Sequence, residues 1–435
     1  MANLSVQPPI TGHTPIGTRF MLAALLPFGL GYFLSYLFRA VNAVVAPDLI
    51  YELHLDAGQL GFLTAAYLLG FSLFQLPLGI LLDRFGPRRV QAALMSIAAL
   101  GALLFSLGHD TATLTVARAL IGLGFAGGLM SSLKAVVLWV PETRRTLASA
   151  CVMSLGAIGL MVSTAPMEWA VARAGWRTAF AGLAAVTAVV ALVILAVVPR
   201  PDATGKPAPL KAQLQNLRTI MRDPAFVRLA PLLGLSAGTQ IAIQTLWAGP
   251  WWRDIGGLDR AGVAHNLLLM AFAFFAGILG TGAIADRAAR HGISPLNVML
   301  GFILASQAAQ MLIILDVLRV PAWLLFSMLG QVAVLAFPWL SQYFGTAASG
   351  RANSAMNLII FTTAFIAQWT IGAIIDLFPP NPSGGFPLAA YRAAFGTFLV
   401  LQLIGLLFYL PAHRHLQSGP RAGQQAPTHA AHTEL

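Results

Sequence analysis

Long apolar runs alternate with short polar stretches along the 435 residues of this chain. Twelve such runs lie at 20–46, 57–82, 90–108, 111–138, 147–170, 177–198, 229–252, 261–285, 295–317, 321–344, 352–377 and 390–411. A helix of about 20 apolar residues is long enough to cross a bilayer. Helices also satisfy their own backbone polar groups in lipid, and the period-2 alternation of barrel strands is missing. The pattern predicts an all-α membrane protein with twelve transmembrane helices.

The polar interruptions divide these runs into two sets of six. We expect one six-helix bundle at 20–198 and a second at 229–411, joined by a polar linker at 199–228. Within the linker, Leu210–Met221 is expected to form a short surface helix. We expect 1–19 to be a cytoplasmic tail and 412–435, which contains few large apolar residues, to be disordered.

The composition agrees with a membrane protein, because only 9% of the residues are charged and 57% are hydrophobic. Soluble domains carry about 25% charged residues. The single cysteine, Cys151, excludes an internal disulfide framework. The sequence has no phosphate-binding Gly loop, no Cys/His cluster with metal-ligand spacing and no Ser/His/Asp arrangement. We therefore expect no enzyme activity, no cofactor and no metal.

The basic residues indicate how the chain is oriented. With the N-terminus placed in the cytoplasm, 17 Lys and Arg residues fall on the cytoplasmic side and 6 on the other. Positive residues gather on the cytoplasmic side of membrane proteins. The net charge of +11 is therefore a topology signal and not a nucleic-acid footprint. We expect a bacterial-type inner membrane with both termini inside.

A charged turn follows the second run, and a related turn follows the eighth. The first reads Gly79-Ile-Leu-Leu-Asp83-Arg84-Phe-Gly86-Pro87-Arg88-Arg89, and the second reads Gly282-Ala-Ile-Ala-Asp286-Arg287-Ala-Ala-Arg290-His-Gly292. The two aspartates are 203 residues apart, nearly half the chain (286 − 83). Both turns resemble the loop 2–3 signature of the major facilitator superfamily. The resemblance implies two related six-helix bundles that rock about a central cavity.

The same resemblance implies a cytoplasmic latch. Gly79 would let a neighbouring helix approach, and Asp83 would cap the positive N-terminus of the eleventh span near Asn353. Glu142 is a candidate ion-pair partner for Arg84 or Arg88. The remaining gating candidates are Arg89, Gly282, Asp286 and Arg287. The alternative is that these residues only set the topology.

Arg39 lies inside the first run, where an arginine costs about 2.5–3.5 kcal/mol to insert. We therefore expect it to face a cavity, with Tyr36 and Asn42 on the same helical face. The pattern Tyr-x-x-Arg, with Pro47 eight residues later, resembles span one of the anion:cation symporters and organophosphate antiporters. That resemblance implies that the arginine holds a carboxylate or phosphate. The alternative is that Arg39 snorkels to the outer interface.

At a repeat offset of 205 residues, Gln244 in the seventh run corresponds to Arg39 in the first, since 39 + 205 = 244. Organophosphate antiporters carry a second arginine there. Here Gln240, Gln244 and Trp247 give a neutral polar-aromatic face, which favours a monoanionic or zwitterionic solute. The alternatives are that the glutamines hold helices together and that Trp251 and Trp252 form an interfacial belt.

Three further charged residues are candidates for coupling. Arg118 begins the segment Arg118-Ala-Leu-Ile-Gly122-Leu-Gly124, which resembles the span-four motif associated with proton coupling. A structural arginine bonded to backbone carbonyls is the alternative. Lys134 is expected to snorkel, or else to be a second cavity cation. Glu168 is a candidate proton carrier, or else an ion-pair partner of Arg173 or Arg177.

These features predict a secondary transporter that moves a small organic anion or amino-acid-like metabolite by alternating access. The expected substrate-binding residues are Tyr36, Arg39, Asn42, Gln240, Gln244 and Trp247. We expect a monomer in the lipid bilayer, with protons as a candidate coupling ion. One alternative is a drug or metabolite exporter that works by proton antiport. Another is a membrane sensor or scaffold that transports nothing.

Overall fold

The computed structural model describes residues 18–199, 210–330, 332–381 and 385–417. These residues are almost entirely helical, and none of them forms a strand. The helices are α1 (Thr18–Ala40), α2 (Asn42–Leu53), α3 (Ala57–Leu73), α4 (Gln75–Leu107), α5 (Thr111–Phe125), α6 (Gly128–Trp139), α7 (Glu142–Val162), α8 (Ala165–Val197), α9 (Leu210–Arg222), α10 (Pro224–Ala242), the π-helix η1 (Ile243–Trp247), α11 (Ala248–Asp254), α12 (Arg260–Arg290), α13 (Pro295–Leu315), α14 (Arg319–Leu329), α15 (Val332–Phe344), α16 (Thr346–Ile375) and α17 (Leu388–Gln417). The expected tails lie mostly outside the described residues.

All twelve predicted runs fall on these helices. Within the described residues, eight helical stretches are long and apolar enough to cross a membrane, and the bent pair α1–α2 makes a ninth. Runs two, five and ten are divided into shorter helices. α3 ends at Leu73 and α7 at Val162. Pro77 and Pro166 lie four residues after Leu73 and Val162. A proline at that position has no N–H to donate to the carbonyl of the earlier residue, and its ring clashes with that carbonyl, so the helix ends there.

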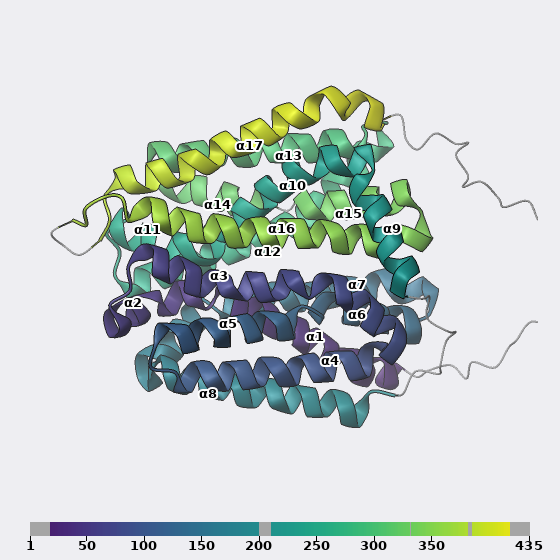
Figure 1. The fold of residues 1–435 in the computed structure, drawn as a ribbon, viewed down its shortest axis with the longest axis horizontal. Coiled ribbons are helices and arrows are strands. Elements are labelled where there is room, and N and C mark those ends of the chain that lie inside the picture. Colours follow the sequence, from purple (N-terminus) through teal and green to yellow (C-terminus); the bar gives the residue numbers. More distant parts are fainter. Residues whose placement is uncertain (1–17, 200–209, 331, 382–384, 418–435) are drawn as a thin grey trace, which may run out of the picture.

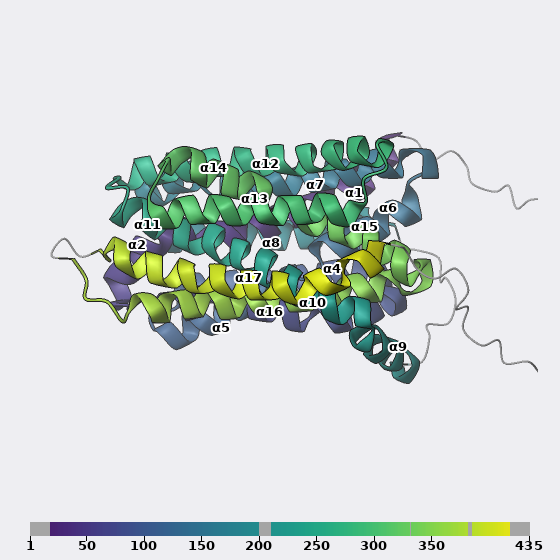
Figure 2. The same cartoon turned by 90° about the horizontal axis from the view of Figure 1, so that it is seen from above.

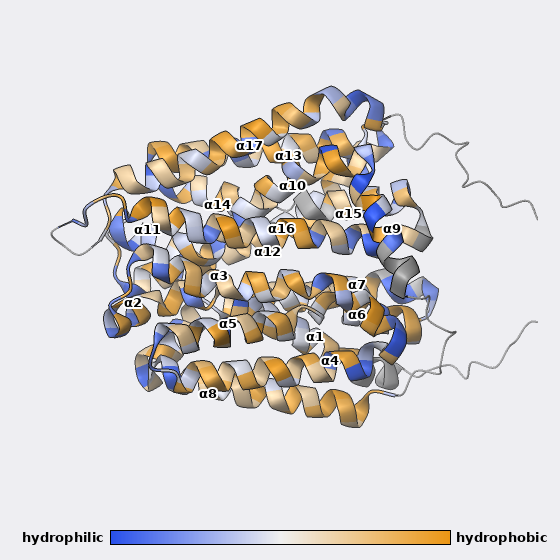
Figure 3. Cartoon of the chain, viewed as in Figure 1, coloured by the Kyte–Doolittle hydropathy of each residue, from blue (hydrophilic) through white to orange (hydrophobic). Residues whose placement is uncertain are grey.

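The helices form two groups that we call the N-terminal half (α1–α8) and the C-terminal half (α10–α17), below and above in Figure 1. Apolar residues dominate the middle of the helices, and polar residues gather at both ends of the molecule (Figure 3). α9 is the expected linker helix. It packs on α10 and α16 and lies at the side of the bundles in Figure 2.

One matched pair of contacts supports an internal repeat. Each charged turn also contains a glycine with positive φ, Gly86 at 74° and Gly292 at 73°, although the two are not at equivalent positions. Arg177 donates to the carbonyl of Gly108 at 2.9 Å, and Arg392 donates to that of Ile314 at 2.9 Å. In each half, therefore, an arginine at the start of the sixth span binds the end of the third.

We name the two ends of the molecule after their aspartates. The Asp83 end carries both charged turns, and the Asp376 end carries the start of α3 and the end of α16. α3 and α16 make the most extensive contact among the described helices. Because α3 belongs to the N-terminal half and α16 to the C-terminal half, this contact joins the two halves.

Candidate functional site

Arg39 is enclosed in the last turn of α1. Only 8% of it is exposed, and its guanidinium lies over the rings of Tyr36 at 4.6 Å, Phe361 at 4.9 Å and Phe71 at 5.1 Å. A snorkelling side chain would reach polar surroundings instead of three aromatic faces. The alternative that Arg39 extends to the outer interface is therefore wrong.

The rings around Arg39 come from both halves. Phe71 of α3 contacts Phe361 of α16, with ring centroids 4.3 Å apart. Tyr36 contacts Phe274 of α12 at 6.0 Å. Arg39 therefore lies between the two halves.

The charge of Arg39 has no carboxylate partner in the part of the chain that the structure describes. Its Nε, within the same residues, also lacks a hydrogen-bond partner. Tyrosine hydroxyls lie nearby instead: Tyr67 donates to the carbonyl of Ser35 at 3.0 Å. A buried cation among rings and hydroxyls attracts an anion, because low polarity strengthens the interaction.

Asn42 does not share the face of Tyr36 and Arg39. The chain bends by 43° between α1 and α2, at Val41, so the helical spacing is interrupted just before Asn42. Its amide nitrogen donates to Thr64 of α3 at 3.0 Å, and the residue is fully buried. The predicted grouping of these three side chains on one face is wrong for Asn42.

The two glutamines of the seventh span do meet. Gln240 Nε2 donates to Gln244 Oε1 at 2.8 Å and to the carbonyl of Phe326 at 3.1 Å. Gln244 lies in η1, and π-helical turns are frequent at functional sites. Because α1 packs against η1, this amide pair lies beside the helix of Arg39.

The tryptophans of this span are internal. Trp247 donates to the carbonyl of Gln368 at 3.0 Å and is 1% exposed, so it joins η1 to α16. Trp251 and Trp252 are 1% and 3% exposed, and both rings contact Trp323. The expected interfacial belt of Trp251 and Trp252 is therefore wrong, since these rings pack inside the C-terminal half.

Arg118 is fully buried and binds the backbone. Its Nη1 donates to the carbonyl of Phe38 at 2.9 Å, and the guanidinium lies 5.1 Å from the ring centre of Tyr67. The glycines of the motif allow tight packing: a Cβ at Gly122 would lie 1.9 Å from the carbonyl oxygen of Tyr67. This geometry agrees with the structural interpretation of Arg118.

Asp83 pairs within its own half. Its carboxylate accepts from Lys134 Nζ at 2.5 Å, and the same Nζ donates to the carbonyl of Leu82 at 2.8 Å. In this conformation Lys134 is engaged with Asp83 and the end of its helix, and the cap of Asp83 on the eleventh span stays a prediction. Neither Gly79 nor Gly282 is in close contact with a described neighbour, since a Cβ at either would meet nothing within 4 Å.

The contacts of the other latch candidates are as follows in this conformation. Arg88 donates to the carbonyl of Leu195, and neither Arg88 nor Arg84 pairs with Glu142 among the described residues. Asp286 and Arg287 are exposed. Among the described residues, the ion pair found at the Asp83 end is that of Asp83 with Lys134, and it lies within the N-terminal half.

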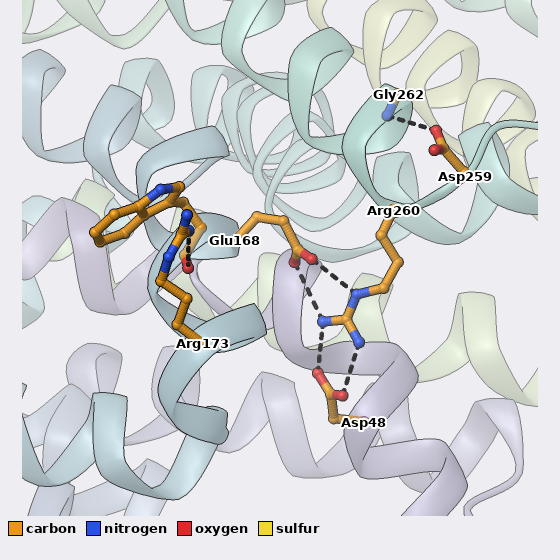
Figure 4. A network of polar contacts seen from close by, with 7 residues as sticks. Asp48, Glu168, Arg173, Asp259, Arg260 and Gly262 are labelled. Carbon is orange, nitrogen blue, oxygen red and sulfur yellow. Dashed lines mark hydrogen bonds and ion pairs between the residues drawn. The ribbon is translucent and has the colours of Figure 1, made fainter.

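At the Asp376 end, ion pairs do connect the halves. Arg260 of α12 lies between Asp48 of α2 and Glu168 of α8 (Figure 4). It donates to both oxygens of Asp48 at 2.8 Å and to those of Glu168 at 2.8 and 3.2 Å. The predicted partners of Glu168 are wrong, because Arg173 stacks on Trp169 and Arg177 binds Glu52.

A small cavity of about 70 Å³ lies beneath this ion-pair cluster, lined by residues that include Pro47, Glu168, Gly249 and Arg260. At this end the two halves are joined by the ion pairs of Arg260 and by the contact of α3 with α16.

Sequence reasoning missed the side chains that enclose Arg39 from outside α1. Phe71 and Phe361 belong to continuous apolar runs, and no local pattern distinguishes them from lipid-facing residues. It also missed the pairing of Arg260 with Asp48, although Arg260, Asp48 and Glu168 all lie at or near predicted span ends. The available signal was that two acids and one arginine lie at span ends on the same side of the membrane.

A family model described as Major Facilitator Superfamily matches residues 28–368. The fold resembles a bacterial homologue of the human lysosomal transporter Spinster in an inward-facing, unoccupied conformation, with a TM-score of 0.69, 17% identity, and coverage of 95% of this chain and 100% of that one. It also resembles a mutant of the nucleoside transporter NupG, with a TM-score of 0.71, 14% identity, and coverage of 89% and 99%.

Curated relatives match over part of their length. A probable sulfoacetate transporter, SauU, of Cupriavidus necator is 30% identical over 172 residues, 40% of each chain. A hexuronate transporter of Escherichia coli is 30% identical over 164 residues, 38% of each chain. The multidrug resistance protein Stp of Mycobacterium tuberculosis is 29% identical over 163 residues, 37% of this chain and 30% of that protein. The matched segment thus spans about two fifths or less of each.

Proposed function

This chain belongs to the major facilitator superfamily, and on that premise we propose that it is a secondary transporter of a small organic anion. The two halves would rock about the site at Arg39 and expose it to one side of the membrane at a time. The bias of Lys and Arg supports an inner-membrane orientation with the Asp83 end in the cytoplasm. The proposed bundles are 20–198 and 229–411.

The buried guanidinium of Arg39, which has no carboxylate partner among the described residues, is the observation that carries this proposal. It is 8% exposed and contacts an aromatic ring from the opposite half. Guanidinium groups bind carboxylates, phosphates and related anions through a planar fork of N–H donors. An anion bound there would contact both halves, so its binding would be coupled to their relative position.

The neutral amides of the seventh span refine the class of solute. Residues 39 and 244 are equivalent in the repeat, and because position 244 is a glutamine, Arg39 is the one cation that these two positions supply. Gln240 Oε1 is buried and, among the described residues, without a hydrogen-bond partner. It could accept from a hydroxyl or ammonium group of the solute, which favours a hydroxylated or zwitterionic acid with one anionic group.

The names of two relatives support the same direction. Sulfoacetate and hexuronates are small organic anions, and the proteins named for them are 30% identical to this chain over 172 and 164 residues. A hexuronate has the single anionic group proposed above, whereas sulfoacetate has two and supports only the broader class of organic anions. The multidrug resistance relative favours the second candidate, an exporter of apolar drugs. The charge of Arg39 opposes that candidate for cationic drugs, because like charges repel strongly in a site of low polarity.

We further propose that the Asp83 latch acts in the opposite conformation. In the described structure Asp83 binds Lys134, while the Asp376 end holds the halves together. Alternating access requires one end to part when the other closes. Asp83, Asp286, and the nearby Arg84, Arg88, Arg89, Arg287 and Glu142 would then join the halves when the Asp376 end opens.

A binding screen tests the proposal. The purified full chain is mixed with glucuronate, galacturonate, sulfoacetate, amino acids, neutral sugars and an apolar cation, and its thermal unfolding is measured. We expect at least one organic anion to raise the unfolding temperature of wild-type protein, while the uncharged analogue of the same shape does not. A response to the cation with none to any anion would favour the exporter and contradict this proposal.

A further inference from the structure

Asp376, at the end of α16, binds the start of α3 in the opposite half. Its carboxylate accepts from the backbone N–H of Ala57 at 2.9 Å and from that of Gly58 at 2.6 Å. The first N–H groups of a helix have no partner within the helix, and the positive end of the helix dipole lies there. A carboxylate is therefore well suited to join α16 to α3 at this point.

The two helices approach closely enough for this contact because glycines line it. A Cβ at Gly58 would lie 2.8 Å from Asp376 Oδ2, and one at Gly61 would lie 2.8 Å from the carbonyl oxygen of Gln368. One at Gly372 would lie 2.3 Å from the carbonyl oxygen of Ala57. Real Cβ atoms do not approach other atoms so closely, so the contact between α3 and α16 depends on these glycines.

A second carboxylate reaches the same place. Asp56 is the N-cap of α3, and its Oδ1 accepts from the N–H of Gln59 at 2.6 Å. From the Cβ position of Gly58, Asp376 Oδ2 is 2.8 Å away and Asp56 Oδ1 is 3.5 Å away. Two acids, one from each half, therefore converge on one helix start.

The charged groups on the other helices of this end are engaged elsewhere. Arg260 binds Asp48 and Glu168, Arg253 binds Asp254, and Arg177 binds Glu52. None of the ion pairs among the described residues includes Asp56 or Asp376. The two carboxylates accept the N–H groups of the first turn of α3, and His54, two residues before Asp56, is exposed at the end of α2.

We propose that Asp56 and Asp376 form a proton-dependent latch between the two halves. The latch is closed most firmly when the pair carries one proton, held on one carboxyl and donated to an oxygen of the other. Asp376 can then still accept an N–H of α3 through its second oxygen. When both carboxyls are ionised, their repulsion favours separation of α3 from α16.

The sign of the pH dependence follows from the environment of Asp376. Partial burial, followed by the nearby charge of Asp56, raises the pKa of Asp376 above its ordinary value, against the opposing effect of the Gly58 and Ala57 amides. In the open state both carboxyls are hydrated and apart, so the pKa returns toward its usual value of about 3.9. The closed state therefore binds the proton more tightly, and acid favours closure. Both aspartates are exposed to solvent, so protons from that side reach them.

Distance measurements between the halves test this proposal without any solute, so the result does not depend on the anion assignment. Spin labels are placed at Tyr51→Cys and Val317→Cys in a Cys151→Ser background, since both side chains are well exposed, 85% and 45%, and lie on opposite halves. The distance distribution is recorded in lipid nanodiscs from about pH 4 to pH 8, the range around the usual carboxyl pKa. We expect the short-distance fraction to grow as the pH falls.

Variants separate the latch from general effects of pH. Asp376→Asn, which is uncharged and can still accept an N–H, should keep the short distance at every pH. Asp56→Asn keeps the helix cap but removes the repulsion, so it should move the midpoint to lower pH. Asp316→Asn, an acid of the same end that pairs with Arg319, should leave the midpoint unchanged. A wild-type distribution that does not change with pH, or an Asp376→Asn variant that changes as much as wild type, would overturn the proposal.

Discussion

Replacing Arg39 by methionine removes the charge from the proposed solute site while keeping an unbranched side chain. A hydrogen bond to a charged group contributes about 1.5–3 kcal/mol. At about 1.4 kcal/mol for each tenfold change, loss of this contact should weaken Kd for the anion by about 10- to 150-fold. Arg39→Lys keeps the charge but loses the planar fork, so its Kd should lie between those of wild type and Arg39→Met.

The same substitution should destabilise the empty protein moderately. An arginine inside a membrane helix costs about 2.5–3.5 kcal/mol. Arg39 lies over three rings, and a desolvated cation–ring contact contributes about 2 kcal/mol. We therefore expect Arg39→Met to lower the free energy of unfolding by about 3 kcal/mol. The unfolding of the empty variant is measured first, so that a lost response to the anion reports binding and not misfolding.

The assay is titration calorimetry with the acid found in the thermal screen, on purified wild-type, Arg39→Met, Arg39→Lys and Arg173→Met proteins. Arg173 is an exposed arginine stacked on Trp169, so its substitution is the matched control and should leave Kd unchanged. Wild-type affinity in the Arg39→Met protein would refute the assignment of the site. A loss of equal size in Arg173→Met would show that the effect is not local.

Three further predictions concern packing and the two ends. Gly122→Ala should destabilise the N-terminal half by about 1–3 kcal/mol, because the added Cβ would meet the backbone of Tyr67. The control Gly182→Ala, whose Cβ would meet open space, should be neutral or stabilise by up to about 1 kcal/mol; chemical unfolding in detergent measures both variants. Asp83→Asn should cost at most about 1 kcal/mol of stability, since the pair with Lys134 is exposed, yet cut solute uptake severely; full uptake by this variant would remove the latch from the mechanism. Arg260→Met should leave Asp48 and Glu168 unpaired and increase the long-distance fraction between labels at Tyr51 and Val317, and an unchanged distribution would show that this cluster does not hold the halves together.

The sequence was sufficient to predict the helical spans because bilayer thickness imposes a length that composition reveals. It also singled out Arg39, a charged residue inside an apolar run, and the structure shows this side chain buried under three aromatic rings. The sequence could not predict that Asn42 leaves the face of Tyr36 and Arg39, because no proline or glycine at Val41 indicates the bend of the helix there. Nor could the partner of Asp83, since an exposed carboxylate beside a loop can reach several basic residues and only the fold decides among them.

The sequence also could not predict which end of the molecule holds the two halves together in this conformation. We expected an aspartate at the end of span two to cap the start of span eleven. The structure instead has Asp376, at the end of span eleven, on the first N–H groups of span two. The physical idea of a carboxylate on a helix start was right, but it applies at the opposite end of the same two helices.

Uptake by proteoliposomes tests the central claim most directly, namely that Arg39 holds an organic anion which the two halves then carry across the membrane. The purified chain is reconstituted, and accumulation of the labelled acid is followed for wild type and Arg39→Met under the same imposed gradients. The account predicts saturable uptake by wild type, competition by other small organic anions but not by neutral analogues, and background uptake by Arg39→Met. Equal uptake by both proteins would contradict it.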